Sequence, residues 1–285
     1  MKTWEQTSEY VIHDSPDEPV EDFERVHVWF SDLDAAPQLD FTGPSGLSAN
    51  ERARVARLKI PLERWRFAAR CHFVRHVLGG IVGVAPASLK FRNGLRGKPW
   101  LSFPIVSKGD RFAVLDFNLA HAENILALAV AFNRKVGIDI EIVKPGVEFL
   151  GVAENFFAPE ECNRLRTLPP TESIVAFDHL WTRKEALAKA SGLGVAVAVS
   201  RETLHASAGT ELHSFDLKLG ETQIVGALAI AERSGESEAA EKISSQQCEQ
   251  ALAEARLQRR NEDLGNFWLQ RQHSRARKPV RSKIF

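Results

Sequence analysis

Cysteine is scarce in this chain of 285 residues, which has only Cys71, Cys162 and Cys248. Such scattered cysteines exclude a disulfide framework and lack the paired spacing of a cysteine-based zinc site. Long apolar runs are also missing, since no stretch approaches the roughly 18 residues that a membrane-spanning helix needs. The N-terminal segment is acidic and lacks the basic-then-apolar order of a signal peptide. We therefore expect a soluble, cytoplasmic protein with no membrane partner.

The chain also lacks an excess of either charge. Lys and Arg number 37, and Asp and Glu number 37, so net charge gives no support to a general polyanion-binding role, and nucleic acid is not an expected partner. The apolar fraction of 44% and the charged fraction of 26% are those of an ordinary globular protein. The length is sufficient for two linked halves of about 100–150 residues each.

Composition divides the chain into four segments. Residues 1–25 are polar and acidic, and we expect them to be a loose lead-in. An N-terminal half at 26–135 and a C-terminal half at 136–231 follow. Residues 232–285 are polar, poor in β-branched residues and basic at the end, which predicts a partly disordered or helical tail. Both a solvated tail and a binding element remain open for this segment.

Hydrophobic periodicity predicts helices and strands in both halves. Ser48 can cap a charged helix, and Pro61 can begin a longer one that Gly79 and Gly80 should end. In the C-terminal half, helices are expected over 155–168 and over 173–192, the second ended by Gly192 and Gly194. The expected strands lie at 27–30, 88–91, 100–103, 112–122, 124–132, 136–143, 212–219 and 223–231.

The two halves share one order of sequence features. Each has a long helix with basic residues at four-residue steps, then a glycine break, then strands. The segments FAARCHFVRHVLGGIVGV and LWTRKEALAKASGLGV are weakly similar in this way. This pattern predicts an internal duplication with a cleft between the two halves.

The segment VGIDIE at 136–141 places two carboxylates on one strand. Side chains alternate along a strand, so Asp139 and Glu141 share one face while Ile138 and Ile140 enter the core. Neighbouring carboxylates repel each other, and a hard divalent cation such as Mg²⁺ or Mn²⁺ relieves that repulsion. A solvent-facing polar edge explains the same pattern, so the segment alone leaves both interpretations open.

The helical segment WTRKEALAKASG places Glu185 and Lys189 one turn apart on the same face. An ordinary surface ion pair is one interpretation. The other is a third metal-binding carboxylate beside an ammonium that stabilises charge in phosphoryl transfer.

Two further segments contain candidate phosphate contacts. His121 stands in FNLAHA, where a single histidine at a strand edge has a structural or a catalytic role. Gly97, Lys98 and Pro99 form a rigid turn in which backbone amides and an ammonium can meet a phosphate. The same turn is also a good connection between two strands.

The order GKP, FNLAH, VGIDIE and WTRKEALAK closely resembles the successive motifs of the Sfp-type 4'-phosphopantetheinyl transferases. The resemblance extends from about Leu47 to Ala231. It implies an α+β fold, a pseudo-dimer of two similar α/β halves with the active site and coenzyme A in the cleft between them. It also implies transfer of 4'-phosphopantetheine from coenzyme A to a serine of an apo carrier protein, which is holo-acyl-carrier-protein synthase activity.

The resemblance also implies roles for particular residues. The magnesium ligands would be Asp139, Glu141 and Glu185, with Mn²⁺ as a substitute metal. Catalytic roles would fall to Glu185, Lys189 and His121. The expected coenzyme A contacts are Gly97, Lys98, Pro99, His121, Lys184 and Lys189, together with Arg54, Arg66 and Arg70 near the 3'-phosphate. Whether Glu185 or a metal-bound water is the base stays open.

Alanines at positions 120 and 122 replace the serines that are common in the family. A lost hydroxyl would remove a phosphate hydrogen bond worth on the order of 1 kcal/mol. This departure and the tail motivate an alternative, a catalytically weak or inactive homologue that binds coenzyme A and docks a partner. The carrier could belong to fatty-acid, polyketide, nonribosomal-peptide or aminoadipate pathways. We expect a monomer, since the duplication is internal.

Overall fold

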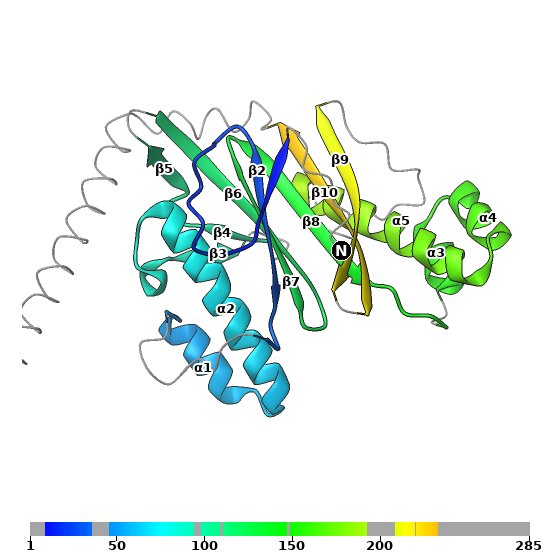
Figure 1. Ribbon diagram of the computed structural model, residues 1–285, viewed down its shortest axis with the longest axis horizontal. Coiled ribbons are helices and arrows are strands. Elements are labelled where there is room, and N and C mark those ends of the chain that lie inside the picture. The colour runs from blue at the N-terminus through cyan, green and yellow to red at the C-terminus, as the bar shows by residue number, and fades with distance from the viewer. Residues whose placement is uncertain are drawn as a thin grey trace, which may run out of the picture. The chain divides into compact units, whose positions relative to one another are not determined.

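The strands form two main sheets and one short ribbon (Figure 1). This computed structural model describes residues 9–35, 46–93, 98–108, 111–146, 149–192, 209–219 and 221–232. The predicted tail therefore lies almost wholly outside the described residues, as do Gly97 and Gly194. All described elements belong to one unit within residues 1–233.

The larger sheet has the strand order β1-β2-β7-β6-β5. Its strands are β1 (Tyr10–His13), β2 (Val26–Asp32), β7 (Ile125–Phe132), β6 (Arg111–Ala122) and β5 (Ile105–Lys108). β1 runs parallel to β2, and the other neighbours are antiparallel.

The second sheet is antiparallel and has the order β8-β10-β9. It consists of β8 (Arg134–Ile142), β10 (Thr222–Glu232) and β9 (Thr210–Leu219). A separate ribbon pairs β3 (Phe91–Asn93) with β4 (Pro99–Leu101). The predicted mixture of helices and strands is thus confirmed.

Helices occupy the segments that periodicity indicated. They are α1 (Ala49–Arg57), α2 (Pro61–Val82), α3 (Leu150–Phe156), α4 (Pro159–Thr167) and α5 (Pro170–Ser191), with a 3-10 turn at Pro86–Ser88. Ser48 caps α1, and its backbone and hydroxyl both meet the Glu51 carboxylate. None of the described helices has the length and apolar character required to cross a membrane.

The prediction that Gly79 and Gly80 end α2 is wrong. The helix continues to Val82 and ends at Gly83, which adopts the left-handed conformation with φ of 75°. A glycine inside a helix costs only about 1 kcal/mol, whereas a left-handed terminus strongly favours glycine. Gly79 is buried, and its lack of a side chain lets the carbonyl of Val84 approach closely.

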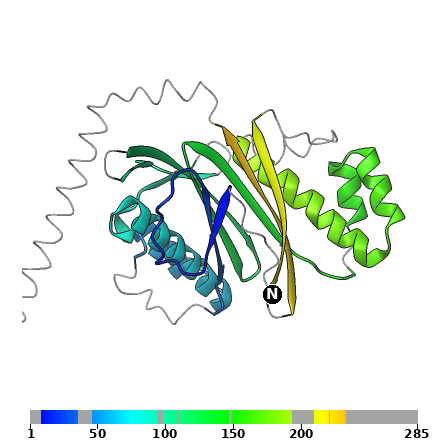
Figure 2. The same ribbon diagram turned by 45° about the horizontal axis from the view of Figure 1, so that its top comes forward.

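The long helices and the two sheets form four layers in the order α2, larger sheet, second sheet and α5 (Figure 2). The alternation of side chains along the strands explains this packing. On β7, Leu126, Leu128 and Val130 pack against α2, while the alternate alanines face the second sheet. On β8, Ile138 and Ile140 enter the core between the two sheets. The opposite face of the second sheet is covered by α5 (Figure 1). The prediction that the two isoleucines are buried is confirmed, and Asp139 and Glu141 alternate with them on β8.

The two sheets repeat one order of elements. In each, a strand leads through a 22-residue helix to an antiparallel pair, giving the strand orders β2-β7-β6 and β8-β10-β9. The helices α2 and α5 each begin at a proline and end at a left-handed glycine, Gly83 or Gly192.

Residues 9–25 differ from the predicted loose lead-in. Tyr10–His13 forms β1, and a buried chain of hydrogen bonds ties it to β2. His13 Nε2 lies 2.8 Å from His27 Nδ1, and the other ring nitrogen of each contacts Glu18 and the Asp22 carbonyl. The polar residues on either side of this short strand hid it, although Tyr10 and Ile12 pack in the core.

His27 predicts a loss of stability in acid. Burial lowers the pKa of His27 to about 4, assisted by the charges of His13 and Arg25 and opposed by Asp22. Because the unfolded residue takes up a proton at about pH 6.5, falling pH favours the unfolded state from there down to about pH 4. We expect a cost of about 3 kcal/mol from this residue. Urea unfolding at pH 7.5 and 4.5 should show a smaller difference for His27→Gln than for the wild type, and an equal difference would contradict the assignment.

Candidate active site

Gly137 brings α5 against β8. A Cβ atom at this position would lie 2.0 Å from the carbonyl oxygen of Ala186 and 2.5 Å from the nitrogen of Ala190. Only glycine therefore permits this approach. This close contact lies two residues before Asp139 on β8, and it brings the charged residues of α5 close to that strand.

Asp139 and Lys189 form the centre of the site. Lys189 Nζ donates to Asp139 Oδ1 at 2.5 Å and to the Ile138 carbonyl at 3.2 Å. Asp139 is 7% exposed, and its other oxygen, Oδ2, is buried without a hydrogen-bond partner among the described residues. A buried, unpartnered carboxylate oxygen is costly unless a cation completes its environment.

Three further carboxylates share this region: Glu141 on β8, and Asp178 and Glu185 on α5. Burial raises the pKa of Asp139 and Glu185, with the attraction of Lys189 opposing the rise. Burial, together with the negative charges of Asp139, Asp178 and Glu185, raises the pKa of Glu141 to about 7, and the charge of Lys189 opposes the rise. This accumulation of negative charge favours bound cations.

The described residues contain no group of three or more His, Cys, Asp or Glu side chains arranged to hold a metal ion. Asp139, Glu141 and Glu185 are thus near enough to repel one another, but they do not converge on one point. Their chemistry still fits a hard divalent cation, because all are oxygen ligands and Asp139 Oδ2 has no partner. The magnesium site stays a prediction.

Basic side chains from three elements act on one another near Lys189. The pKa of His121 on β6 is lowered by partial burial of the ring and by the positive charges of Arg70 and Lys189. Burial also lowers the pKa of Arg70 on α2, helped by Arg54. Arg70, His121 and Lys189 thus interact electrostatically, and an anion bound among them would relieve their repulsion.

All three of the predicted N-terminal arginines have other contacts as well. The Arg54 and Arg70 guanidinium groups lie 4.6 and 5.3 Å from the ring centre of Phe67. Arg66 makes a two-point ion pair with Asp34, with distances of 2.8 and 2.5 Å. Of the three, Arg70 is the one whose charge acts on His121.

Lys98 of the GKP turn is held by Asp116. Its ammonium donates to Asp116 Oδ2 at 2.8 Å and to the Val136 carbonyl at 2.9 Å. Asp116 Oδ2 also accepts from the Val136 amide at 2.9 Å, and Asn118 accepts from the Ile138 amide at the same distance. Asp116 and Asn118 therefore connect β6 to β8, and Asp116 also connects Lys98 to β8. Pro99 begins β4 and is half-buried.

Replacing Asp116 should test this connection. Asp116→Ala leaves Lys98 and the Val136 amide without their shared acceptor, so we expect the free energy of unfolding to fall by about 3 kcal/mol. Asp116→Asn should cost less, because its amide oxygen can still accept from Val136. Urea unfolding measures both. Two variants within about 0.5 kcal/mol of the wild type would show that the connection is unimportant.

Lys184, which the family resemblance predicts to contact coenzyme A, lies where α5 meets α4. Its side chain is 2% exposed, pairs with Glu161 Oε2 at 3.0 Å, and places its ammonium 5.2 Å from the ring centre of Phe157. Lys184 thus joins α5 to α4, and its contact with coenzyme A stays a prediction.

Ala120 and Ala122 are 5% and 8% exposed and belong to the core between the sheets. They alternate with His121 along β6, so their side chains point away from the imidazole. Their small size suits this packed position.

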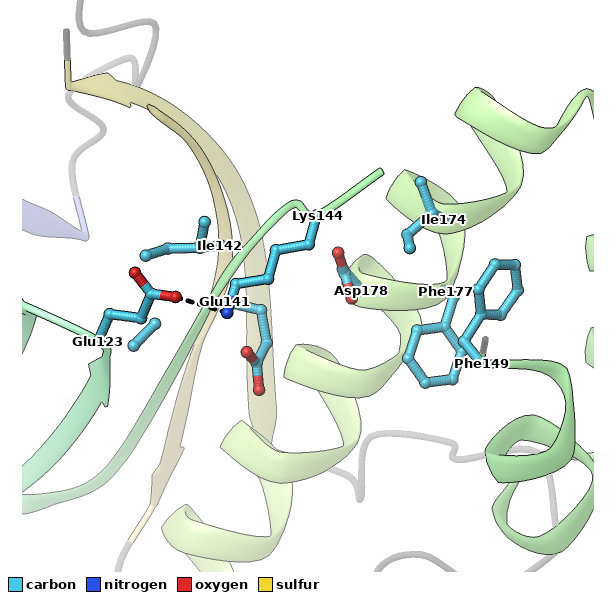
Figure 3. Close-up of a pocket in the computed structure, with 9 residues that line it drawn as sticks. Glu123, Glu141, Ile142, Lys144, Phe149, Ile174, Phe177 and Asp178 are labelled. Atoms are coloured by element: carbon cyan, nitrogen blue, oxygen red, sulfur yellow. Dashed lines mark ion pairs between the residues drawn. The ribbon is translucent and has the colours of Figure 1, made fainter. Parts of the chain in front are cut away.

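A pocket adjoins the carboxylates on the side away from Lys189. Glu141 and Asp178 line it together with the apolar side chains of Phe149, Ile174 and Phe177 (Figure 3). Sequence reasoning missed Asp178. The available signal was its spacing, since Asp178 precedes Glu185 by two helical turns on α5.

Comparison with known proteins matches this arrangement to one family. A family model described as the 4'-phosphopantetheinyl transferase superfamily matches residues 135–223, which include β8 and α5. The 4'-phosphopantetheinyl transferase HetI of Nostoc sp. strain PCC 7120 is 39% identical over 175 residues, covering 61% of this chain and 71% of that protein. The chain belongs to the 4'-phosphopantetheinyl transferase superfamily. The predicted family and transferase class are therefore confirmed.

Other members of the superfamily show similar coverage. A putative 4'-phosphopantetheinyl transferase of Synechocystis sp. strain PCC 6803 is 34% identical, over 52% of this chain and 58% of that protein. The 4'-phosphopantetheinyl transferase psf-1 of Bacillus pumilus is 30% identical, over 62% of this chain and 70% of its own. The family model covers Asp139, Glu141, Glu185 and Lys189, whereas the cations of α2 and β6 lie before the residues that it matches.

Proposed function

We propose that this member of the superfamily transfers the 4'-phosphopantetheine arm of coenzyme A to a serine of an apo carrier protein, with release of 3',5'-ADP. The observation that carries the proposal is the meeting of two sets of charges. Asp139, Glu141 and Glu185 supply the acidic set, and Arg70, His121 and Lys189 supply the basic set.

The basic set suits the phosphates of coenzyme A. Arg70 and His121 would bind them from the first sheet and its helix, and Lys189 from α5. Lys98 is already engaged by Asp116 and has one ammonium proton left for a substrate. Lys189 can exchange its contact with Asp139 for a phosphate oxygen and so stabilise the oxygen that leaves.

The acidic set would hold Mg²⁺, or Mn²⁺ in its place, through Asp139, Glu141 and Glu185. The unpartnered Oδ2 of Asp139 favours this assignment. A divalent cation there would neutralise charge on the pyrophosphate of coenzyme A.

The transfer then follows from the remaining residues. The carrier serine oxygen forms a bond to the β-phosphorus, and the bond from that phosphorus to the bridging oxygen breaks. 3',5'-ADP leaves with the electron pair, stabilised by Lys189. The hydroxyl proton would pass to the Glu185 carboxylate, one of the two bases that the sequence leaves open.

The repeated element order supports a duplicated architecture. The shared orders β2-β7-β6 and β8-β10-β9, each with a 22-residue helix, favour a pseudo-dimer of halves at 26–135 and 136–231. Coenzyme A would bind in a cleft between the halves, where both charge sets meet. An internal duplication also favours a monomer, and a carrier substrate favours a cytoplasmic location.

Intact-mass measurement of apo carrier proteins tests the proposal. Carriers from fatty-acid, polyketide, nonribosomal-peptide and aminoadipate pathways are incubated with coenzyme A, Mg²⁺ and the full-length enzyme. At least one should gain the mass of the phosphopantetheine arm, and Glu185→Gln should abolish that gain. Absence of modification on every carrier would refute the proposal, and coenzyme A binding without turnover would favour the binding-protein alternative.

A further inference from the structure

Asp178 is a buried acid with no partner. It is 9% exposed and makes no hydrogen bond or ion pair with any residue that the structure describes. Burial raises its pKa to about 6. Leaving a carboxylate in this state costs stability, and residues that cost stability are common where a ligand supplies the missing contact.

Asp178 opens into the pocket beside Glu141 (Figure 3). The walls contributed by Phe149, Ile174 and Phe177 are apolar, and at the rim Lys144 pairs with Glu123 at 2.5 Å. Two carboxylates with apolar walls and an ammonium at the rim are too few oxygen ligands for another divalent cation. The pocket instead suits a group that has an apolar part and a hydrogen-bond donor.

The two ends of α5 carry different charges, and this difference assigns coenzyme A and the carrier protein to different ends of the helix. Asp178 and Lys189 are eleven positions apart on the helix, which corresponds to about 16 Å along its axis. The anionic coenzyme A is attracted to the Lys189 end, and the negative charge of Asp178 disfavours its phosphates in the pocket. A substrate that approaches Glu185 from the Asp178 end is therefore the neutral or cationic one.

We propose that this pocket receives the serine-bearing segment of the carrier protein, and that Asp178 accepts an N–H hydrogen bond from that segment. Phe149, Ile174 and Phe177 contact an apolar side chain beside the serine. This inference rests on the proposed transferase function and assigns the acceptor side of the same site. Asp178 is thus a specificity-determining residue for the carrier.

Steady-state kinetics of Asp178→Asn test the inference. The apo carrier that the wild type modifies fastest serves as the probe, with each substrate varied in turn. The KM for the carrier should rise about tenfold or more, since a hydrogen bond to a charged group is lost. The KM for coenzyme A and the kcat at saturating carrier should stay within about twofold of the wild type.

The matched control is Glu172→Gln, an exposed carboxylate in the first turn of the same helix. It should leave both KM values unchanged. Thermal unfolding adds a second readout. Asp178→Asn removes an unpartnered buried charge, so its Tm at pH 8 should rise by a few degrees.

Different failures are distinguishable. If the wild type modifies a carrier and Asp178→Asn leaves its KM unchanged, this inference is wrong and the proposed function stands. An equal rise in the KM for coenzyme A would place Asp178 on the donor side and overturn the inference. A drop in Tm or loss of folding would show that Asp178 is structural. If the wild type modifies no carrier, the proposed function and this inference both fall.

Discussion

Asp139→Ala should lower the rate of phosphopantetheine transfer by a factor on the order of 10³ or more. Asp139 joins the two charge sets, because one oxygen accepts from Lys189 and the other is buried without a partner. The alanine variant removes the proposed metal ligand and frees Lys189 from its position. The rate of mass gain on the apo carrier, measured under single-turnover conditions, gives the comparison.

Two controls separate charge from shape. Asp139→Asn keeps the volume and an acceptor for Lys189 but removes the negative charge, so it should lose nearly as much activity as the alanine variant. Asp216→Asn changes an exposed carboxylate on β9 and should retain the wild-type rate. Transfer by Asp139→Ala at more than about a tenth of the wild-type rate would contradict the assigned role.

Gly137→Ala should prevent stable folding of the C-terminal sheet against α5. Its Cβ would meet backbone atoms of Ala186 and Ala190 at 2.0 and 2.5 Å. Backbone atoms cannot rotate aside, so the helix and the strand must separate. We expect a loss of about 3 kcal/mol or more in the free energy of unfolding, accompanied by loss of transfer activity. Urea unfolding followed by circular dichroism measures the first effect.

The matched control is Gly80→Ala on α2. A Cβ at Gly80 meets no atom within 4 Å, and the residue is exposed in a helix. Alanine is the better helix former, so this variant should gain about 0.5–1 kcal/mol. Similar stability changes in the two variants would show that the close approach of α5 to β8 is not what requires Gly137.

Most elements could be predicted from the sequence because their signals are local. A continuous apolar run marked β7, period-two alternation marked β8, and Pro61, Gly192 and the Ser48 cap marked helix ends. Asp139 and Glu185 were identified from the order of motifs that the chain shares with the transferase family. The glycine of VGIDIE lies two residues before Asp139. Because it lets α5 approach β8 closely, it brings Glu185 of that helix near Asp139.

Contacts between distant segments could not be predicted in the same way. Asp116 and Asn118 of β6 bind amides of β8, and no periodic signal indicates a side chain that replaces a strand partner. Asp178 is separated from Glu141 in the sequence by α3, α4 and the first turns of α5. The two residues line one pocket only because α5 packs against β8. The ion pair of Lys184 with Glu161 could not be predicted either, because it depends on the placement of α4.

Magnesium dependence of carrier modification tests the central claim most directly. The full-length enzyme is freed of divalent ions with a chelator, and the initial rate of mass gain on the apo carrier is measured as Mg²⁺ is added back. The account predicts no transfer without the metal, a saturable rise in the wild type, and no rise in Asp139→Asn. A wild-type rate that is independent of Mg²⁺, or the same rise in the variant, would contradict it.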